Sequence, residues 1–192
     1  MPKKIKGKIA SVDLEAYTKI LHFFFAYPTN AFSLSDISST LSIHKQTASK
    51  IIKQFQKEEF LDIETIGNLW RITCNQKHYY NIVKKIPYNI QLIYESGIVA
   101  HIREQIPQAK CIILFGSYRK GDDTVGSDID IAVEVLDDKD VQIMQLGVVT
   151  HLGYRKNVVV NLYIFSRNHI NLNLFNNIAN GIVLEGFLEV RP

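Results

Sequence analysis

One stretch between two apolar segments constrains this chain more than any other. Residues 111–115, Cys-Ile-Ile-Leu-Phe, have the composition of a buried strand and run directly into Gly116-Ser117. After ten further residues, a second apolar segment opens with Asp128-Ile-Asp130. Because side chains alternate between the two faces of a strand, both aspartates project from one face, about 7 Å apart along the chain.

These residue types indicate phosphate and metal chemistry. Two carboxylates held that close repel each other unless a cation lies between them, and Mg²⁺ is a hard cation that prefers oxygen ligands. A Gly-Ser turn that enters a helix offers backbone N–H groups and a hydroxyl to a phosphate. Together these features indicate phosphoryl or nucleotidyl transfer. The alternative is an acidic surface turn on an ordinary α/β domain.

The spacing also carries a family resemblance. The pattern Gly-Ser, ten residues, Asp-x-Asp, formed by Gly116, Ser117, Asp128 and Asp130, resembles the signature of the DNA polymerase β nucleotidyltransferase superfamily, in particular its minimal nucleotidyltransferases. The intervening loop has glycine and serine where that family usually has them, at Gly121 and Ser127. The resemblance implies a small mixed α/β domain that uses Mg²⁺ or Mn²⁺ and takes ATP or another NTP as substrate.

The resemblance assigns roles residue by residue. The expected metal ligands are Asp128 and Asp130. The expected catalytic residues are Asp128, Asp130 and Asn161. The residues expected around the nucleotide are Gly116, Ser117, Arg119, Lys120 and Ser127, with Arg119 and Lys120 neutralising charge.

Asn161 is the one departure from the family pattern. Relatives have a third carboxylate on the next strand, which here matches residues 157–165, with Asn161 at the corresponding position. An amide oxygen can ligate a metal but is uncharged, and it cannot accept the proton of the acceptor hydroxyl. Glu134 shares the face of the two aspartates but lies about 13 Å beyond Asp130 along an extended strand. We therefore expect a metal–nucleotide site with two carboxylates and weakened catalysis.

Residues 1–75 have the pattern of a separate small domain. Apolar periodicity and turn signals predict helices over 12–27 and from Ser33 to about Leu41, a third helix within 41–55, and two strands over 61–65 and 69–73. The second and third helices are joined by a short polar turn, which is the helix-turn-helix pattern. With the hairpin that follows, the segment resembles winged helix-turn-helix domains.

The third helix has polar and basic side chains outside its apolar stripe. The candidate DNA-contacting residues are Lys45, Gln46, Thr47, Ser49, Lys50 and Lys53. On a recognition helix such side chains can reach base edges and phosphates in the major groove of duplex DNA. The alternatives are a solvated face of a packing domain or a protein-docking module. Ten Lys/Arg against seven Asp/Glu give residues 1–75 a net charge of +3, whereas eight against ten give residues 110–192 a net charge of −2.

The remaining segments complete an α+β architecture. Residues 76–106 predict a helical connector that breaks at Pro87 and stops before Pro107. This connector is apolar enough to pack one module onto the other or to form a homodimer seam. The segment that follows predicts helices over 140–154 and 170–180, a strand over 157–165, and a closing apolar segment over 182–186. The expected domains are a winged helix-turn-helix over 1–75, the connector over 76–106 and a nucleotidyltransferase-like domain over 107–192.

Composition narrows the setting. The apolar share of 46% is enough for a folded core, and no apolar run is long enough to span a membrane. Cys74 and Cys111 lack metal-binding spacing, which predicts a reduced, cytoplasmic protein without zinc.

Two functions of different classes remain open. The first is a nucleotidyltransferase that moves a nucleoside monophosphate from an NTP to a hydroxyl acceptor, with a DNA-binding front domain. The second is a DNA-binding regulator, or antitoxin-like adaptor, whose weakened nucleotidyltransferase domain binds nucleotide or mediates dimerisation. Because some minimal relatives modify a paired toxin, a toxin-like protein partner is a family-level expectation.

Overall fold

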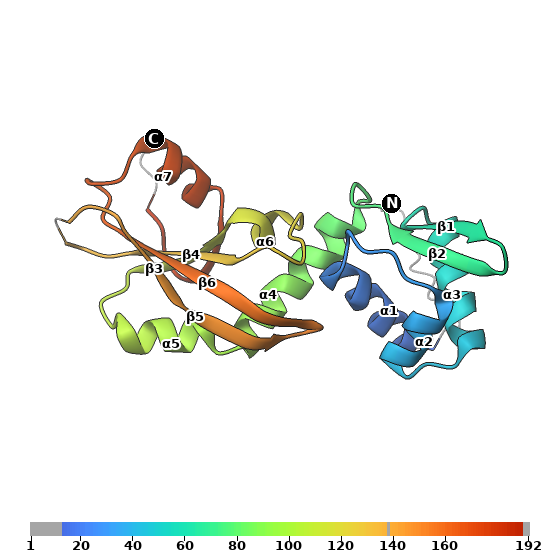
Figure 1. Ribbon diagram of the computed structural model, residues 1–192. Helices are drawn as coiled ribbons and strands as arrows, with labels where there is room; N and C mark the ends of the chain where they lie inside the picture. The colour runs from blue at the N-terminus through green and yellow to red at the C-terminus, as the bar shows by residue number, and fades with distance from the viewer. Residues whose placement is uncertain (1–12, 138, 190–192) are drawn as a thin grey trace, which may run out of the picture. The chain divides into compact units, whose positions relative to one another are not determined.

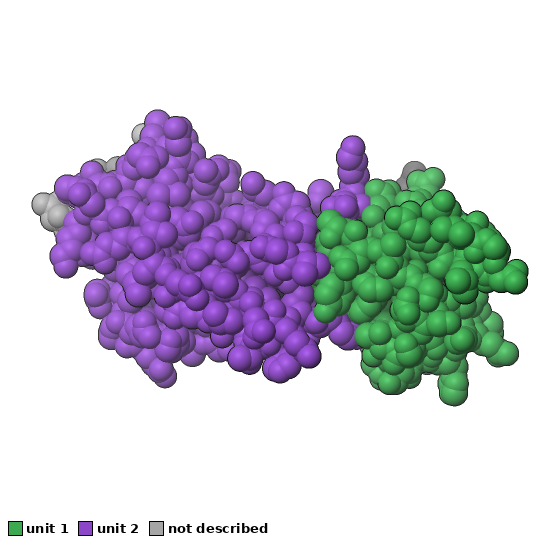
Figure 2. All heavy atoms as spheres, viewed as in Figure 1, with its two compact units in different colours: residues 1–75 green, residues 76–192 purple. Residues whose placement is uncertain are grey.

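The computed structural model describes residues 13–137 and 139–189. Position 12, the first of the predicted helix 12–27, lies outside these residues. The chain divides into two compact units, Met1–Asn75 and Gln76–Pro192, which are coloured separately in Figure 2. The segment predicted as a connector, 76–106, therefore clusters with the second unit.

The first unit contains three helices followed by a hairpin. The helices are α1 (Leu14–Ala26), α2 (Leu34–Leu41) and α3 (Lys45–Lys57), and the strands are β1 (Leu61–Ile66) and β2 (Leu69–Cys74). The start of α2 is a capping box, in which Ser33 and Asp36 each accept a hydrogen bond from the other's backbone N–H. β1 and β2 pair antiparallel, and an isolated bridge joins Phe32 to Ile72 on β2.

Aromatic side chains fill the centre of the first unit. The fully buried ones are Phe24, Phe25, Phe55 and Phe60. Phe60 meets Phe25 and Phe55 edge-on, with ring centroids 5.8 and 5.2 Å apart, an arrangement that aromatic quadrupoles favour. The apolar faces of α1 and α3 therefore meet in one core, as their sequence periodicity predicts.

The second unit opens with helices. A π-helical turn, η1 (Asn81–Lys85), runs into α4 (Ile86–Glu95), and α5 (Ile98–Gln105) follows. The predicted break at Pro87 is wrong, because Pro87 lies in the first turn of α4, where its missing N–H costs no helical hydrogen bond. The interruption comes instead at Ser96-Gly97.

A five-stranded sheet forms the body of the second unit (Figure 1). Its strands are β3 (Cys111–Phe115), β4 (Ile129–Glu134), β5 (Gln142–Leu152), β6 (Arg155–Phe165) and β7 (Ile182–Gly186), in the order β5-β6-β4-β3-β7. β4 and β6 are parallel, and the other neighbours are antiparallel. Two helices complete the unit, α6 (Gly116–Lys120) and α7 (Leu172–Ala179).

The helix predicted over 140–154 is wrong, because this segment is the edge strand β5. A register shift between Gln145 and Gly147 interrupts the alternation of side chains and gives the apolar residues a helix-like spacing. Pairing with β6 decides the outcome, since Leu152 and Arg155 are opposed across a two-residue turn. The turn begins at Gly153, whose φ of 57° suits the tight turns that join hairpins.

The two faces of the sheet carry separate cores. One core packs the sheet against α4 and α5 and includes Ile93, Ile98, Ile102, Ile131 and Leu162. The other joins the opposite face to α7 and includes Ile113, Ala132, Phe165 and Ile178. Because side chains alternate along β4 and β6, Asp128, Asp130 and Asn161 belong to the α7 face.

Candidate functional site

The three residues predicted to be catalytic come together at the start of β4. Asp128 immediately precedes the strand, and Asp130 is opposed to Asn161 in the parallel pairing of β4 with β6. The Asn161 amide nitrogen Nδ2 donates to Asp128 Oδ2 and to Asp130 Oδ1, at 3.3 Å in each case. Asn161 therefore contacts both carboxylates.

The orientation of the Asn161 amide follows from charge. Facing two carboxylates, the amide presents its donor nitrogen, because its oxygen would be repelled. Asp128 and Asp130 thus converge on one point that already holds a partial positive charge. This donor set fits one divalent cation, with waters filling the coordination sites that the protein leaves open. For Asn161 to become a ligand, its amide must turn over and present Oδ1.

The surroundings of the site raise the pKa of two of its side chains. Burial raises the pKa of Asp130 above its usual value, the charge of Asp128 raises it further, and the hydrogen bond from Asn161 opposes both effects. Burial also raises the pKa of the neighbouring Tyr163 hydroxyl, with additional contributions from Asp130 and Asp128. A bound cation would relieve the repulsion between the two carboxylates.

Gly116 lies directly against one of these carboxylates. Its φ is 72°, and a Cβ atom placed there would lie 2.4 Å from Asp130 Oδ2. Phe115, the preceding residue, is opposed to Asp130 across β3 and β4. Only glycine combines this backbone conformation with this close approach. As a result, α6 begins immediately beside the carboxylates, with Ser117 as its second residue.

The other residues expected around the nucleotide are arranged differently. Arg119 and Lys120 lie in the last turn of α6, and across residues 13–137 and 139–189 no hydrogen bond or ion pair joins them to the carboxylates. Ser127 is engaged within its own loop, where its hydroxyl accepts a hydrogen bond from the N–H of Thr124 at 2.9 Å. The structure thus gives Ser127 a loop-shaping contact.

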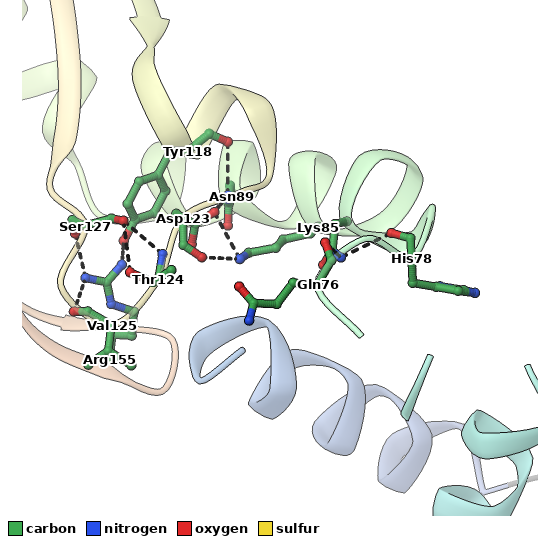
Figure 3. A network of polar contacts seen from close by, with 11 residues as sticks. Gln76, His78, Lys85, Asn89, Tyr118, Asp123, Thr124, Val125, Ser127 and Arg155 are labelled. Carbon is green, nitrogen blue, oxygen red and sulfur yellow. Dashed lines mark hydrogen bonds and ion pairs between the residues drawn. The ribbon is translucent and has the colours of Figure 1, made fainter. Parts of the chain in front are cut away.

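A buried polar network, which the sequence did not predict, holds the loop that leads to Asp128 (Figure 3). Lys85 and Asp123 have side chains that are 1% and 3% exposed, and their Nζ and Oδ1 atoms are 3.2 Å apart. Lys85 also donates to the carbonyl of Asp123 at 2.6 Å. Asn89 donates to Asp123 Oδ1 at 2.7 Å and to the carbonyl of Tyr118 at 3.0 Å. Burial raises the pKa of Asp123, and Lys85 acts in the opposite direction.

Arg155 holds the other side of the same loop. Its guanidinium donates to the carbonyls of Val125 and Ser127, at 2.8 and 2.6 Å, and to the hydroxyl of Tyr118. Figure 3 shows Arg155 on one side of the loop and Lys85 and Asn89 on the other. Residues 121–128 are thereby fixed to η1, α4 and β6, which positions Asp128 at the start of β4.

A separate candidate surface lies on α3 of the first unit. Of the residues predicted to contact DNA, Lys45, Gln46, Lys50 and Lys53 are exposed, and Thr47 and Ser49 are half-buried. Lys45, Gln46, Ser49 and Lys50 line a shallow hollow together with Leu34. The hairpin has a different character, because Asp62 and Glu64 are exposed on β1 and Ile66 and Leu69 are exposed at its tip.

Two further observations concern metal binding and membrane spans. Within the part of the chain that the structure describes, no group of three or more His, Cys, Asp or Glu side chains is arranged to hold a metal. Any third protein ligand of a cation at Asp128 and Asp130 would therefore be a neutral oxygen, such as that of the Asn161 amide. None of the described helices combines the length and the apolar character needed to cross a membrane.

Comparison with known proteins agrees with the geometry of the second unit. Residues 98–185 match the family model described as Polymerase beta, Nucleotidyltransferase. The matched segment contains Gly116, Ser117, both aspartates and Asn161, and it supports a nucleotidyltransferase domain in this part of the chain. No match was found among curated proteins.

Proposed function

We propose that this chain is a metal-dependent nucleotidyltransferase that transfers a nucleoside monophosphate from an NTP, with ATP the expected donor, to a hydroxyl acceptor. The observation that carries the proposal is the convergence of Asp128 and Asp130 on one point directly beside Gly116 and Ser117. This arrangement lies within the residues that match the nucleotidyltransferase family model.

In this proposal, different residues bind the metal ion and the phosphate groups. Asp128 and Asp130 would hold Mg²⁺ or Mn²⁺, which when bound supplies positive charge to the triphosphate. Ser117 and the backbone N–H groups at the start of α6 would bind phosphate oxygens, and Arg119 and Lys120 would add positive charge nearby. Such catalysis consists mainly of positioning and electrostatic stabilisation. The buried network around Asp123 supports it by fixing the loop before Asp128.

Asn161 favours a second candidate of another class. Its Nδ2 is a neutral donor bonded to both carboxylates, where relatives would have a third negative charge. A neutral amide cannot take the proton of an acceptor hydroxyl. The second candidate is therefore a DNA-binding regulator, or an adaptor for a toxin-like protein partner, whose second unit binds a metal–nucleotide without efficient transfer.

One experiment separates the two candidates. The protein is incubated with ATP labelled in its α-phosphate and Mg²⁺ or Mn²⁺, together with a panel of possible acceptors that includes DNA ends and protein hydroxyls. The enzyme proposal expects labelled product from the wild type and none from Asp128→Ala/Asp130→Ala. Product formed only by Asn161→Asp would refute turnover and support the regulator. Failure of every protein to bind Mn²⁺–ATP in equilibrium dialysis would refute both.

We further propose that α3 binds duplex DNA. The support is the cluster of exposed basic residues on α3, which contrasts with the acidic and apolar hairpin. Each phosphate interaction that a substitution removes should reduce the slope of log K against log salt by about 0.9. Alanine at Lys45, Lys50 and Lys53 should therefore flatten the salt dependence, whereas Lys57→Ala, at the end of the same helix, serves as the control. Affinity unchanged by the triple substitution would exclude this surface.

A further inference from the structure

The outer edge of β5 is unprotected. β5 is 11 residues long, stands first in the order β5-β6-β4-β3-β7, and pairs only with β6 in the described part of the chain. No Lys, Arg, Asp, Glu or Pro occurs from Val141 to Tyr154. Ile143, Met144 and Val148 are 62%, 47% and 46% exposed. A long, uncharged edge with exposed apolar side chains is a template for pairing with another strand.

The other sheet edges in the described residues are protected in recognisable ways. β7, at the opposite side of the same sheet, has five residues, and its Leu184 carbonyl accepts a hydrogen bond from the Tyr94 hydroxyl at 2.6 Å. Glu185 on β7 is ion-paired with Arg103. In the first unit, β1 carries exposed acidic side chains, and the bridge from Phe32 covers part of β2. Short length, charge, covering segments and bulges all protect an edge, and of these β5 has a bulge, between Gln145 and Gly147.

The bulge in β5 defines which part of the edge can pair. The register shift between Gln145 and Gly147 divides the strand into a four-residue segment and a six-residue segment, Gly147–Leu152. A bulge interrupts regular pairing, so the longer segment is the better template. Within it, Val148, Thr150 and His151 are exposed. Its pairing with β6 keeps one register from Val148 opposite Val159 to Leu152 opposite Arg155, but Thr150 falls out of the ladder where Asn157 on β6 has a φ of 54°.

We propose that two copies of this chain associate through antiparallel pairing of Gly147–Leu152, which would join their sheets into one continuous sheet. A strand paired antiparallel with its own copy is related to it by a two-fold axis, which closes the assembly at two subunits. The uncharged segment creates no like-charge repulsion between copies. It also offers no cation to a phosphate backbone, which argues against a nucleic acid at this edge.

This assembly would bring the partner close to the nucleotide site. Gln145 on β5 is opposite Asn161 on β6, and Asn161 is opposite Asp130 on β4. With strands about 4.8 Å apart, a strand added beyond β5 would lie about 14 Å from β4. The inference does not depend on the proposed function, because it rests on the edge and not on the carboxylates.

Sedimentation velocity of the full chain over a range of concentrations tests the proposal. The wild type should shift from monomer to dimer as concentration rises, and Val148→Lys/Thr150→Lys should weaken the dimer at least tenfold, because the two paired strands would then carry four lysines close together. Val183→Lys, at an exposed position of β7, is the matched control and should dimerise like the wild type. A wild type that stays monomeric, or a dimer unaffected by the β5 lysines, would overturn the proposal.

Amide hydrogen exchange provides a second measurement that needs no variant. In the wild type, amides of Gly147–Leu152 should become at least tenfold better protected as the concentration passes from monomer to dimer, while those of β7 should not change. Concentration-dependent protection located elsewhere would show that the copies meet through another surface.

Discussion

The loop between β3 and β4 places two kinds of carboxylate within a few residues of each other. Asp123 is 3% exposed and receives an ion pair and a 2.7 Å hydrogen bond from side chains of other elements. Asp128 is exposed, Asp130 is half-buried, and from the described side chains each receives a single hydrogen bond, at 3.3 Å, from the same amide nitrogen. The carboxylate of Asp123 is thus buried and firmly paired, whereas those of Asp128 and Asp130 are more open and weakly paired.

This difference separates a structural role, that of Asp123, from a ligand-binding role, that of Asp128 and Asp130. The Asp123 carboxylate is buried and paired with Lys85 and Asn89, and its contribution is to hold the loop in one conformation. Asp128 and Asp130 keep oxygen lone pairs available to a cation, while burial and, to a smaller extent, the charge of Asp128 raise the pKa of Asp130. A binding site is most selective when rigid neighbours hold its ligands in place. The Asp123 network provides that rigidity for Asp128.

Removing the positive charge of Lys85 beside Asp123 should have the largest effect. Lys85→Met keeps most of the side-chain volume but leaves Asp123 buried without its charge partner. Breaking a buried pair in this way costs about 3–5 kcal/mol. We expect a loss of that size in the free energy of unfolding, measured by urea denaturation followed by circular dichroism.

The controls for this prediction separate charge from packing. Lys120→Met removes an exposed lysine on α6 and should change stability by no more than about 0.5 kcal/mol. Lys85→Met/Asp123→Leu removes both charges and should recover much of the loss, because apolar replacements of a buried pair are often tolerated. If Lys85→Met alone were as stable as the wild type, Lys85 and Asp123 would not form the supporting network.

The same contrast explains what could be predicted from the sequence. Asp128 and Asp130 were identifiable because strand alternation brings them to one face, and Asn161 because it matches the third carboxylate of the family pattern. The role of Asp123 was not, because Asp122 and Asp123 are equivalent in sequence and the choice between them depends on Lys85, 38 residues earlier. Lys85 lies in an ordinary helical pattern and Arg155 beside a turn, so nothing local in the sequence indicated that either side chain would hold this loop.

The elements follow the same rule. Helices α1 to α3 and the β1–β2 hairpin depend on local periodicity, capping and turn residues, and they form at the predicted positions. β5 was wrongly predicted as a helix because its state depends on pairing with β6 and on a bulge that disguises its alternation. Local patterns therefore predicted the first unit well, while tertiary pairing decided part of the second.

The close approach of Gly116 to Asp130 provides the second test. Gly116→Ala should strain the backbone and push the Asp130 carboxylate out of place, since the new methyl group would lie 2.4 Å from Oδ2. We expect a destabilisation of about 1–3 kcal/mol. Binding of Mn²⁺, measured by isothermal titration calorimetry on the folded variant, should weaken at the same time.

Gly126→Ala is the matched control for this substitution. Gly126 lies in the same loop, but a Cβ atom added there would meet nothing within 4 Å. It should leave both stability and Mn²⁺ affinity close to the wild type. Equal effects of the two substitutions would mean that the loop as a whole, and not the contact with Asp130, controls the site.

The smallest expected effect is the pH dependence of metal binding at Asp128 and Asp130. A protonated carboxyl is a poor ligand, so the apparent Mn²⁺ affinity should rise with pH until Asp130 is ionised and then become constant. Burial and Asp128 raise the pKa of Asp130, so the plateau should begin above the usual value of 3.8 for an aspartate. Below the plateau, one competing proton lowers the affinity about tenfold per pH unit.

Asp128→Asn should bind Mn²⁺ more weakly overall but reach its plateau at lower pH, because the neighbouring negative charge is gone. A plateau that begins at the same pH in both proteins would show that Asp128 does not influence the ionisation of Asp130, and that the two carboxylates do not form one site.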